Sequence, residues 1–114
     1  MQQKRVVITG LGLVTPLGND VASTWQNLIQ GKSGADNITH FDASKFKTQF
    51  ACEVKGLDMS SLLDAKELRR YDRYIHYALK SAEEALLDAK VSIEQEDAPR
   101  CGVIFGSGMG GIYT

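Results

Sequence analysis

An apolar stripe at helical spacing, between about Asp64 and Lys90, constrains the fold more than any other feature of this sequence. Apolar residues recur there three and four positions apart, which is the pattern of a helix with one buried face. They are Tyr71, Ile75, Ala78, Leu79, Ala82, Ala85, Leu86 and Ala89. Asp72 also suits the N-cap position of a second helix, so the stripe predicts either one long helix or two helices with a break. In both cases another apolar layer has to cover the stripe.

Three short runs around this stripe have the composition of strands. Residues 5–9, RVVIT, are rich in β-branched side chains, and residues 48–54, TQFACEV, alternate as an edge or hairpin strand does. Residues 100–106, RCGVIFG, form a third apolar run. Because these runs alternate with helical patterns, we expect an α/β fold in which helices connect the strands of a sheet.

A shorter helix is expected between residues 21 and 29. Asp20 is a suitable N-cap for this helix, and Gly31 is a suitable stop signal after it. Residues 31–46 are rich in Gly, Ser, Asp and Asn and are therefore expected to form a loop. Residues 92–99, SIEQEDAP, are expected to form a polar connector.

Composition excludes several classes of protein. The length of 114 residues is that of one domain, and a net charge of −1 argues against a general nucleic-acid binder. No apolar run approaches the roughly 20 residues of a membrane span, and the N-terminus does not have the pattern of a signal peptide. Two cysteines make neither a disulfide framework nor a metal cluster, so we expect a cytoplasmic protein without a bound metal or cofactor.

Three glycine-containing motifs raise the possibility of a phosphate site. Residues 106–111, GSGMGG, have G-x-G-x-x-G spacing after an apolar run, but too few residues follow for the helix that such a site requires. Residues 10–15, GLGLVT, lack the third glycine, and we favour a tight turn with close backbone packing there. Residues 31–33, GKS, lack the first glycine of a P-loop and follow a helix, so we discard them.

The cysteines and histidines give no catalytic signature. A thiolate paired with an imidazole base is feasible chemistry for Cys52 or Cys101 with His40 or His76. No local motif supports such a pair, and Cys101 starts an apolar run in which a small inert thiol is the simpler role. We therefore expect structural roles for all four residues.

A set of basic residues lies on one side of the predicted long helix. Its members are Lys66, Arg69, Arg70, Arg73 and Lys80. At about 100° per residue they cluster opposite the apolar stripe and point outward. One interpretation is a solvated helix face, supported by pairs such as Lys80 with Glu84. The other is a docking patch for an acidic partner or a phosphate-bearing arm.

Taken in order, four stretches of the sequence carry a family resemblance. They are RVVITGLGLVTPLGND, TWQNLIQGKSG, YDRYIHYALKSAEEALLDA and GVIFGSGMGG. The chain resembles the N-terminal part of a β-ketoacyl-acyl-carrier-protein synthase, and among these enzymes the synthase II class of bacterial fatty-acid synthesis. The resemblance implies that residues 1–114 are a partial ketoacyl synthase domain. It also implies the opening part of the N-terminal half of a thiolase-like fold, a mixed sheet flanked by helices.

The resemblance implies an acyltransferase that elongates fatty acids by decarboxylative condensation. A cysteine takes an acyl group from the carrier protein, and the carbanion left by decarboxylation of malonyl-carrier protein attacks that thioester. The nucleophilic cysteine and two assisting histidines lie in the family downstream of Thr114, so this chain has no catalytic residue and is expected to be inactive alone. Its unpaired strands and uncovered apolar faces are also expected to promote association.

The resemblance assigns two groups of site residues. Met109, beside Gly108, falls where an apolar residue lines and gates the acyl pocket, for which a flexible thioether is suited. Lys66, Arg69 and Arg70 fall where the family presents basic residues to its acidic acyl carrier protein. A homodimer is expected for the full-length family member.

Three alternatives stay open at this point. The chain is also compatible with a non-catalytic module that binds the carrier protein through its basic residues. A fragment of a polyketide-type ketosynthase, or of its inactive chain-length partner, shares the same N-terminal pattern. A nucleotide-binding domain built on the two glycine loops is the weakest alternative, because neither loop has its required partner elements.

Overall fold

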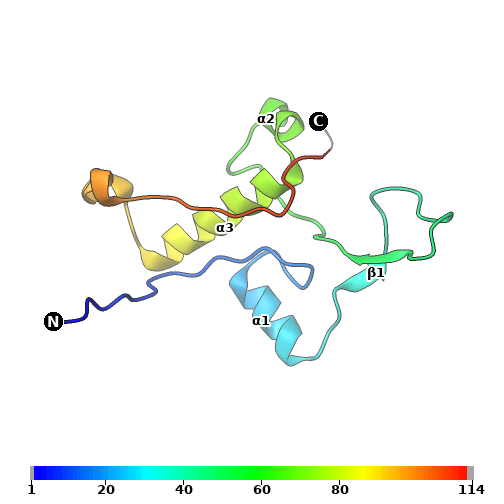
Figure 1. The fold of residues 1–114 in the computed structure, drawn as a ribbon, viewed down its shortest axis with the longest axis horizontal. Helices are drawn as coiled ribbons and strands as arrows, with labels where there is room; N and C mark the ends of the chain where they lie inside the picture. The colour runs from blue at the N-terminus through cyan, green and yellow to red at the C-terminus, as the bar shows by residue number, and fades with distance from the viewer. Residues whose placement is uncertain (1, 113–114) are drawn as a thin grey trace.

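A computed structural model describes residues 2–112 of the chain. It contains three α-helices, two short strands and two 3₁₀ turns (Figure 1). In chain order they are α1 (Val21–Ile29), β1 (Ala35–Asn37), β2 (Phe50–Cys52), α2 (Ala65–Arg70), α3 (Arg73–Ala89), η1 (Ile93–Gln95) and η2 (Ala98–Arg100). The long helix α3 lies at the centre, and both the N-terminal and the C-terminal segments run along it.

Helix α1 begins and ends at the predicted signals. The carboxylate of Asp20 accepts hydrogen bonds from the Ser23 backbone N–H at 2.7 Å and from the Ser23 hydroxyl at 2.6 Å. The hydroxyl bond and then the backbone bond lower the pKa of Asp20. At the other end, Gly31 has a φ of 67°, and the amides of Gly31 and Lys32 donate to Leu28 and Asn27. These bonds form a Schellman motif, so the predicted cap and stop are both confirmed.

The apolar stripe forms two helices with a break at residues 71–72. Asp64 accepts from the amides of Lys66 and Glu67, and the Glu67 side chain accepts from the Asp64 amide, which completes a capping box for α2. Asp72 occupies the N-cap of α3, but its side chain makes no capping hydrogen bond there. The prediction of two helices is therefore confirmed, and the single-helix alternative is wrong.

A small hairpin is the one sheet in the described part of the chain. β1 and β2 pair antiparallel, with Asp36 opposite Ala51. The strand predicted at residues 48–54 is thus confirmed for Phe50–Cys52. The loop predicted at residues 31–46 is wrong at Ala35–Asn37, where cross-strand pairing overrides a composition that favours loops. An ion pair between Asp36 and Lys55, 3.0 Å long, also ties β1 to the chain after β2.

The strands predicted at residues 5–9 and 100–106 are not formed as hydrogen-bonded strands. Residues 100–106 run along α3 and residues 5–9 lead into the turn that packs on it, but neither segment pairs with a neighbour among the described residues. Several of their apolar side chains are exposed, with Val6 93% and Ile104 97% exposed. The prediction was wrong because apolar composition favours a strand, whereas assigning one requires a partner for its backbone groups.

The described chain is open rather than compact. Its radius of gyration is 17.4 Å, compared with about 13 Å for a globular domain of this length. Among apolar side chains, only Ala43 and Met59 are buried in the described part. The uncovered apolar faces predicted from the sequence are thus present. No helix within residues 2–112 has both the length and the apolarity to cross a bilayer.

Candidate functional site

The N-terminal glycine turn packs directly against α3. A Cβ added to Gly12 would collide with the Ser81 carbonyl oxygen, and one added to Gly10 would collide with that of Ala85 and lie 2.8 Å from the Cβ of Ala89. Small residues one turn apart on α3 therefore face two glycines, so that backbone approaches backbone. This confirms the close-packing interpretation of GLGLVT. These contacts are helix packing, the role predicted for this turn in preference to nucleotide binding.

Two carboxylates on α3 hold this turn in register. The Leu11 amide donates to Asp88 Oδ2 at 2.9 Å, and the Leu13 amide donates to Glu84 Oε2 at 2.9 Å. The second oxygen of Glu84 accepts from the amide of Val21 at 2.8 Å, which is the first residue of α1. Glu84 therefore caps α1 from a different helix. This role of Glu84 was not predicted from the sequence, in which the only signal for it is the spacing of two acidic residues four apart on α3.

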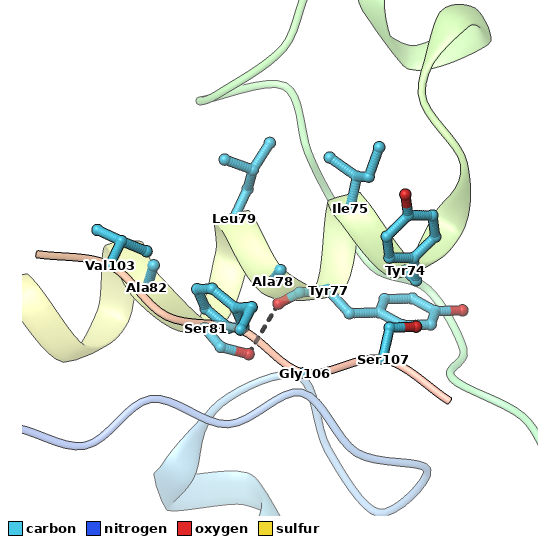
Figure 2. A pocket seen from close by; sticks show the side chains of 11 residues that line it. Tyr74, Ile75, Tyr77, Ala78, Leu79, Ser81, Ala82, Val103, Gly106 and Ser107 are labelled. Carbon is cyan, nitrogen blue, oxygen red and sulfur yellow. Dashed lines mark hydrogen bonds between the residues drawn. The ribbon is translucent and has the colours of Figure 1, made fainter. Parts of the chain in front are cut away.

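An apolar groove lies between α3 and the C-terminal segment (Figure 2). It encloses about 560 Å³, within the range of small-molecule sites. Its walls are formed on α3 by Tyr74, Ile75, Tyr77, Ala78, Leu79, Ser81 and Ala82, and opposite by Val103, Phe105, Gly106 and Ser107. The Ser81 hydroxyl donates to the Tyr77 carbonyl at 2.8 Å, so it is satisfied within the helix. The groove therefore has the chemistry to hold an alkyl chain.

The glycine-rich loop borders this groove with its first residues only. Gly106 and Ser107 line the groove, whereas a Cβ added to Gly108 would meet no atom within 4 Å. Met109 is 80% exposed and lies outside the groove. The loop then turns at Gly110, whose φ is 63° and whose amide donates to the Ser107 hydroxyl at 3.0 Å.

The break between α2 and α3 divides the predicted basic face. Lys66, Arg69 and Arg70 are all exposed on α2, and Arg73 is exposed on the first turn of α3. Lys80 is half-buried and pairs with Glu83 at 2.7 Å. The predicted partner, Glu84, was wrong because that carboxylate binds the backbone of the N-terminal segments. The exposed members of the predicted basic face thus belong to α2 and the start of α3.

The cysteines and histidines do not meet as catalytic pairs in the described residues. Cys52 and Cys101 are free and exposed, and the thiol of Cys101 donates to the Asp97 carbonyl at 3.6 Å. His40 Nδ1 lies 3.4 Å from Glu53 Oε1, and the buried Nε2 of His76 has no hydrogen-bond partner among the residues that the structure describes. Within residues 2–112, no three His, Cys, Asp or Glu side chains are grouped to hold a metal ion.

A buried carboxylate organises the loop of the hairpin. Glu53 accepts from the Thr39 hydroxyl at 2.7 Å, from the Thr39 amide at 3.1 Å and from the His40 amide at 3.3 Å. The Thr39 hydroxyl makes the largest contribution to lowering the pKa of Glu53, and burial opposes it. Glu53 therefore ties the loop after β1 to the end of β2.

Comparison with known proteins gives the family of this chain. Residues 3–114 match the family model described as the N-terminal domain of β-ketoacyl synthases. The chain belongs to the β-ketoacyl synthase family. It is 50% identical over 112 residues to the 3-oxoacyl-[acyl-carrier-protein] synthase 2 of Coxiella burnetii and 45% identical over 113 residues to that of Staphylococcus aureus. These matches cover 98% and 99% of this chain but 27% of each relative.

A solved ketosynthase shares the fold. The chain superposes on the ishigamide ketosynthase/chain length factor with a TM-score of 0.68 and 32% identity. The superposition covers 77% of this chain and 22% of that structure. The predicted fold, an opening part of a thiolase-like α/β arrangement, is therefore confirmed, and the family named from the four sequence stretches is confirmed with it.

Proposed function

We propose that this chain is the N-terminal part of a β-ketoacyl-acyl-carrier-protein synthase that elongates fatty acids. The observation that carries the proposal is the 50% identity to a 3-oxoacyl-[acyl-carrier-protein] synthase 2 across nearly the whole chain. The reaction transfers an acyl group from the carrier protein to a cysteine thiolate. Malonyl-carrier protein then loses carbon dioxide, and its carbanion attacks the thioester and releases the cysteine.

The direct test uses the full-length synthase that contains this sequence, not residues 1–114 alone. It is incubated with acyl-carrier protein and malonyl-carrier protein, and the products are measured by mass spectrometry. We expect release of carbon dioxide and a 3-oxoacyl-carrier protein two carbons longer than the acyl donor. Decarboxylation without a condensed product, or no reaction with any acyl donor, would contradict the proposal.

Within this activity, we assign recognition of the carrier protein to α2. Its exposed residues Lys66, Arg69 and Arg70 present three positive charges on six helical residues, with a capping box that fixes the start of the helix. An acidic carrier protein is attracted to such a surface, and this attraction weakens as salt screens the charges.

Charge reversal tests this assignment. Arg69→Glu is expected to weaken carrier-protein binding about tenfold or more and to reduce its salt dependence. Arg100→Glu makes the same change of charge on the exposed turn η2, away from α2, and serves as the matched control. Equal losses of affinity in both variants would show that only net charge matters and would contradict docking at α2.

We assign the acyl pocket to the apolar groove and the loop that borders it, with Met109 and Gly108 at its edge. The support is that Gly106 and Ser107 line the groove and that Met109 follows them on the same loop. Met109→Ala is expected to improve the use of longer acyl chains relative to short ones, because a smaller side chain at the edge of the groove obstructs a chain that extends past that edge less. An unchanged ratio of kcat/KM between long and short donors would contradict this role.

We infer that residues 1–114 alone do not form an acyl-enzyme. The family mechanism requires a nucleophilic cysteine and two histidines, and neither Cys52 nor Cys101 is hydrogen-bonded to a histidine in the described part. The 114-residue chain is incubated with radiolabelled acyl-carrier protein and analysed on a denaturing gel. Label that stays on the chain and is released by hydroxylamine would overturn the inference.

A second candidate has specific support from the solved relative. That relative is described as a ketosynthase/chain length factor, which favours a polyketide-type role or a chain-length partner. Repeated condensation to poly-β-keto products would indicate this role, whereas a single elongation indicates the fatty-acid enzyme. Carrier-protein binding without condensation would indicate a non-catalytic module.

We also propose that the full-length protein is a cytoplasmic homodimer. Light scattering tests the oligomeric state, and cell fractionation tests the location.

A further inference from the structure

The glycine-rich loop ends against the residue that precedes α3. Asp72 occupies the N-cap of α3 without making a capping hydrogen bond. Its carboxylate instead lies beside Gly111, where an added Cβ would collide with Asp72 Oδ2 and lie 2.7 Å from its Cγ. A side chain at position 111 would therefore displace the carboxylate of Asp72 from its place beside the loop. This contact joins the start of α3 to the end of the loop.

A second pair of residues, Gly110 and Tyr74, extends the same contact. Gly110 has a φ of 63°, and a Cβ there would lie 3.8 Å from the Tyr74 Cζ atom, so the ring of Tyr74 lies against the turn. The amide of Gly110 also donates to Ser107 at 3.0 Å. The last part of the loop is thus closed on itself and seated on the first turn of α3.

The glycine-rich loop lies between two hollows, the apolar groove and a second cavity whose lining includes charged residues. Gly106 and Ser107 line the apolar groove, whereas Gly110 and Gly111 line a second cavity of about 500 Å³ together with Asp72. Tyr74 borders both hollows. Met109 lies between the two pairs of loop residues, and its side chain is exposed rather than packed. Its location is therefore set by how the loop is held at its two ends.

We propose that Asp72 is a positioning residue, acting through Gly111, that fixes the glycine-rich loop and so determines where Met109 stands at the edge of the acyl groove. It would thereby influence the length of acyl chain that the synthase accepts. The proposal rests on the proposed function. Within the described part of the chain Asp72 is not among the residues that line the apolar groove, so its effect on selectivity is transmitted through the loop.

The helix-capping role of Asp72 is separated from the positioning role by the choice of variant. Asp72→Ser keeps a residue that favours the N-cap position, but the shorter side chain does not reach Gly111. Asp72→Asn keeps both the cap preference and the reach, and is expected to behave as the wild type. Asp88→Ser makes the same substitution near the other end of α3, where the carboxylate binds the Leu11 amide, and serves as the control.

The activity test measures kcat/KM for a short and a long acyl-carrier protein with the full polypeptide. Asp72→Ser is expected to change the ratio of the two values by about tenfold, the effect of roughly one methylene group in an apolar pocket. Asp72→Asn and Asp88→Ser are expected to leave the ratio unchanged. In a Met109→Ala background, Asp72→Ser is expected to have little further effect, because the two residues act in series. An equal loss of rate for both donors would overturn the proposal.

A second readout does not depend on activity. The methyl group of Met109 is labelled with ¹³C and its NMR signal is assigned by its loss in Met109→Leu. Asp72→Ser is expected to shift this signal, and Asp88→Ser is not. An unmoved signal in Asp72→Ser would overturn the positioning role even if the protein proved to have another activity. A shifted signal in a protein without condensing activity would instead support positioning and refute the proposed function.

Discussion

Replacing Gly12 by alanine tests how closely the N-terminal turn and α3 are packed. The added Cβ would collide with the carbonyl oxygen of Ser81 and would lie 2.9 Å from the backbone nitrogen of Ala85. Both obstacles are helix backbone, which does not move aside as the end of a flexible side chain does. We therefore expect the N-terminal segment to be displaced from α3.

The size of the effect follows from what the displacement breaks. Overpacking a close contact costs about 1–3 kcal/mol. The amides of Leu11 and Leu13 flank Gly12, and each donates to a carboxylate on α3. A hydrogen bond to a charged group contributes about 1.5–3 kcal/mol. If both bonds are lost, the free energy of unfolding falls by about 4 kcal/mol at the low end of these ranges, a large part of the stability of an ordinary domain.

The assay is equilibrium denaturation of the polypeptide in urea, with Gly31→Ala as the matched control. Gly31 has a φ of 67°, and a Cβ there would meet nothing within 4 Å, so that variant suffers only backbone strain of about 1–2 kcal/mol. Gly12→Ala is expected to be clearly less stable than Gly31→Ala. A Gly12→Ala protein as stable as this control would refute the reasoning.

Three further predictions concern carboxylates. Glu84→Ala is expected to lower the free energy of unfolding by about 2–4 kcal/mol, because two backbone amides lose their acceptor. Glu94 is exposed, so Glu94→Ala is expected to leave the free energy of unfolding unchanged, and urea denaturation measures both variants. Asp64→Ala removes the capping box and is expected to destabilise α2 by about 1–2 kcal/mol, seen as faster hydrogen exchange of its amides, with no change at α3. Hydrogen bonds lower the pKa of Glu53, so its stabilisation of the hairpin loop is complete above the unfolded-state pKa of about 4.3 and is lost as the pH falls through the lower folded value. Exchange of the loop amides is expected to show this dependence, and Glu53→Gln is expected to abolish it.

The parts of the fold that local rules determine were predictable from the sequence. Asp20 and Gly31 mark the ends of α1 because capping and the left-handed conformation depend on a few adjacent residues. The strand pairing of Ala35–Asn37 was not predictable, since its composition is that of a loop and its partner lies beyond a long loop. Residues 5–9 show the converse case, in which a strand-like composition has no hydrogen-bonding partner in the described chain.

The candidate site was predictable only in its residue types. The exposure of Lys66, Arg69 and Arg70 followed from the helical period, because the apolar stripe has to face inward. The roles of Glu84 and Asp72 were not predictable, because each acts on backbone that is distant in sequence and carries no matching side chain. The helical period carries no information on the glycine-rich loop, whose assignment to the acyl pocket came from the family resemblance.

The contacts of Glu84 and Asp88 also bear on the order in which this region is built during synthesis. The amides of Leu11, Leu13 and Val21 precede their acceptors by 77, 71 and 63 residues. The ribosome therefore releases the glycine turn and α1 well before the helix that holds them exists. At the usual rates of translation, of about 5–20 residues per second, that interval lasts several seconds. Through that time the apolar N-terminal segment lacks both the helix on which it packs and the carboxylates that accept its hydrogen bonds. It stays exposed to solvent until the synthesis of α3 is complete.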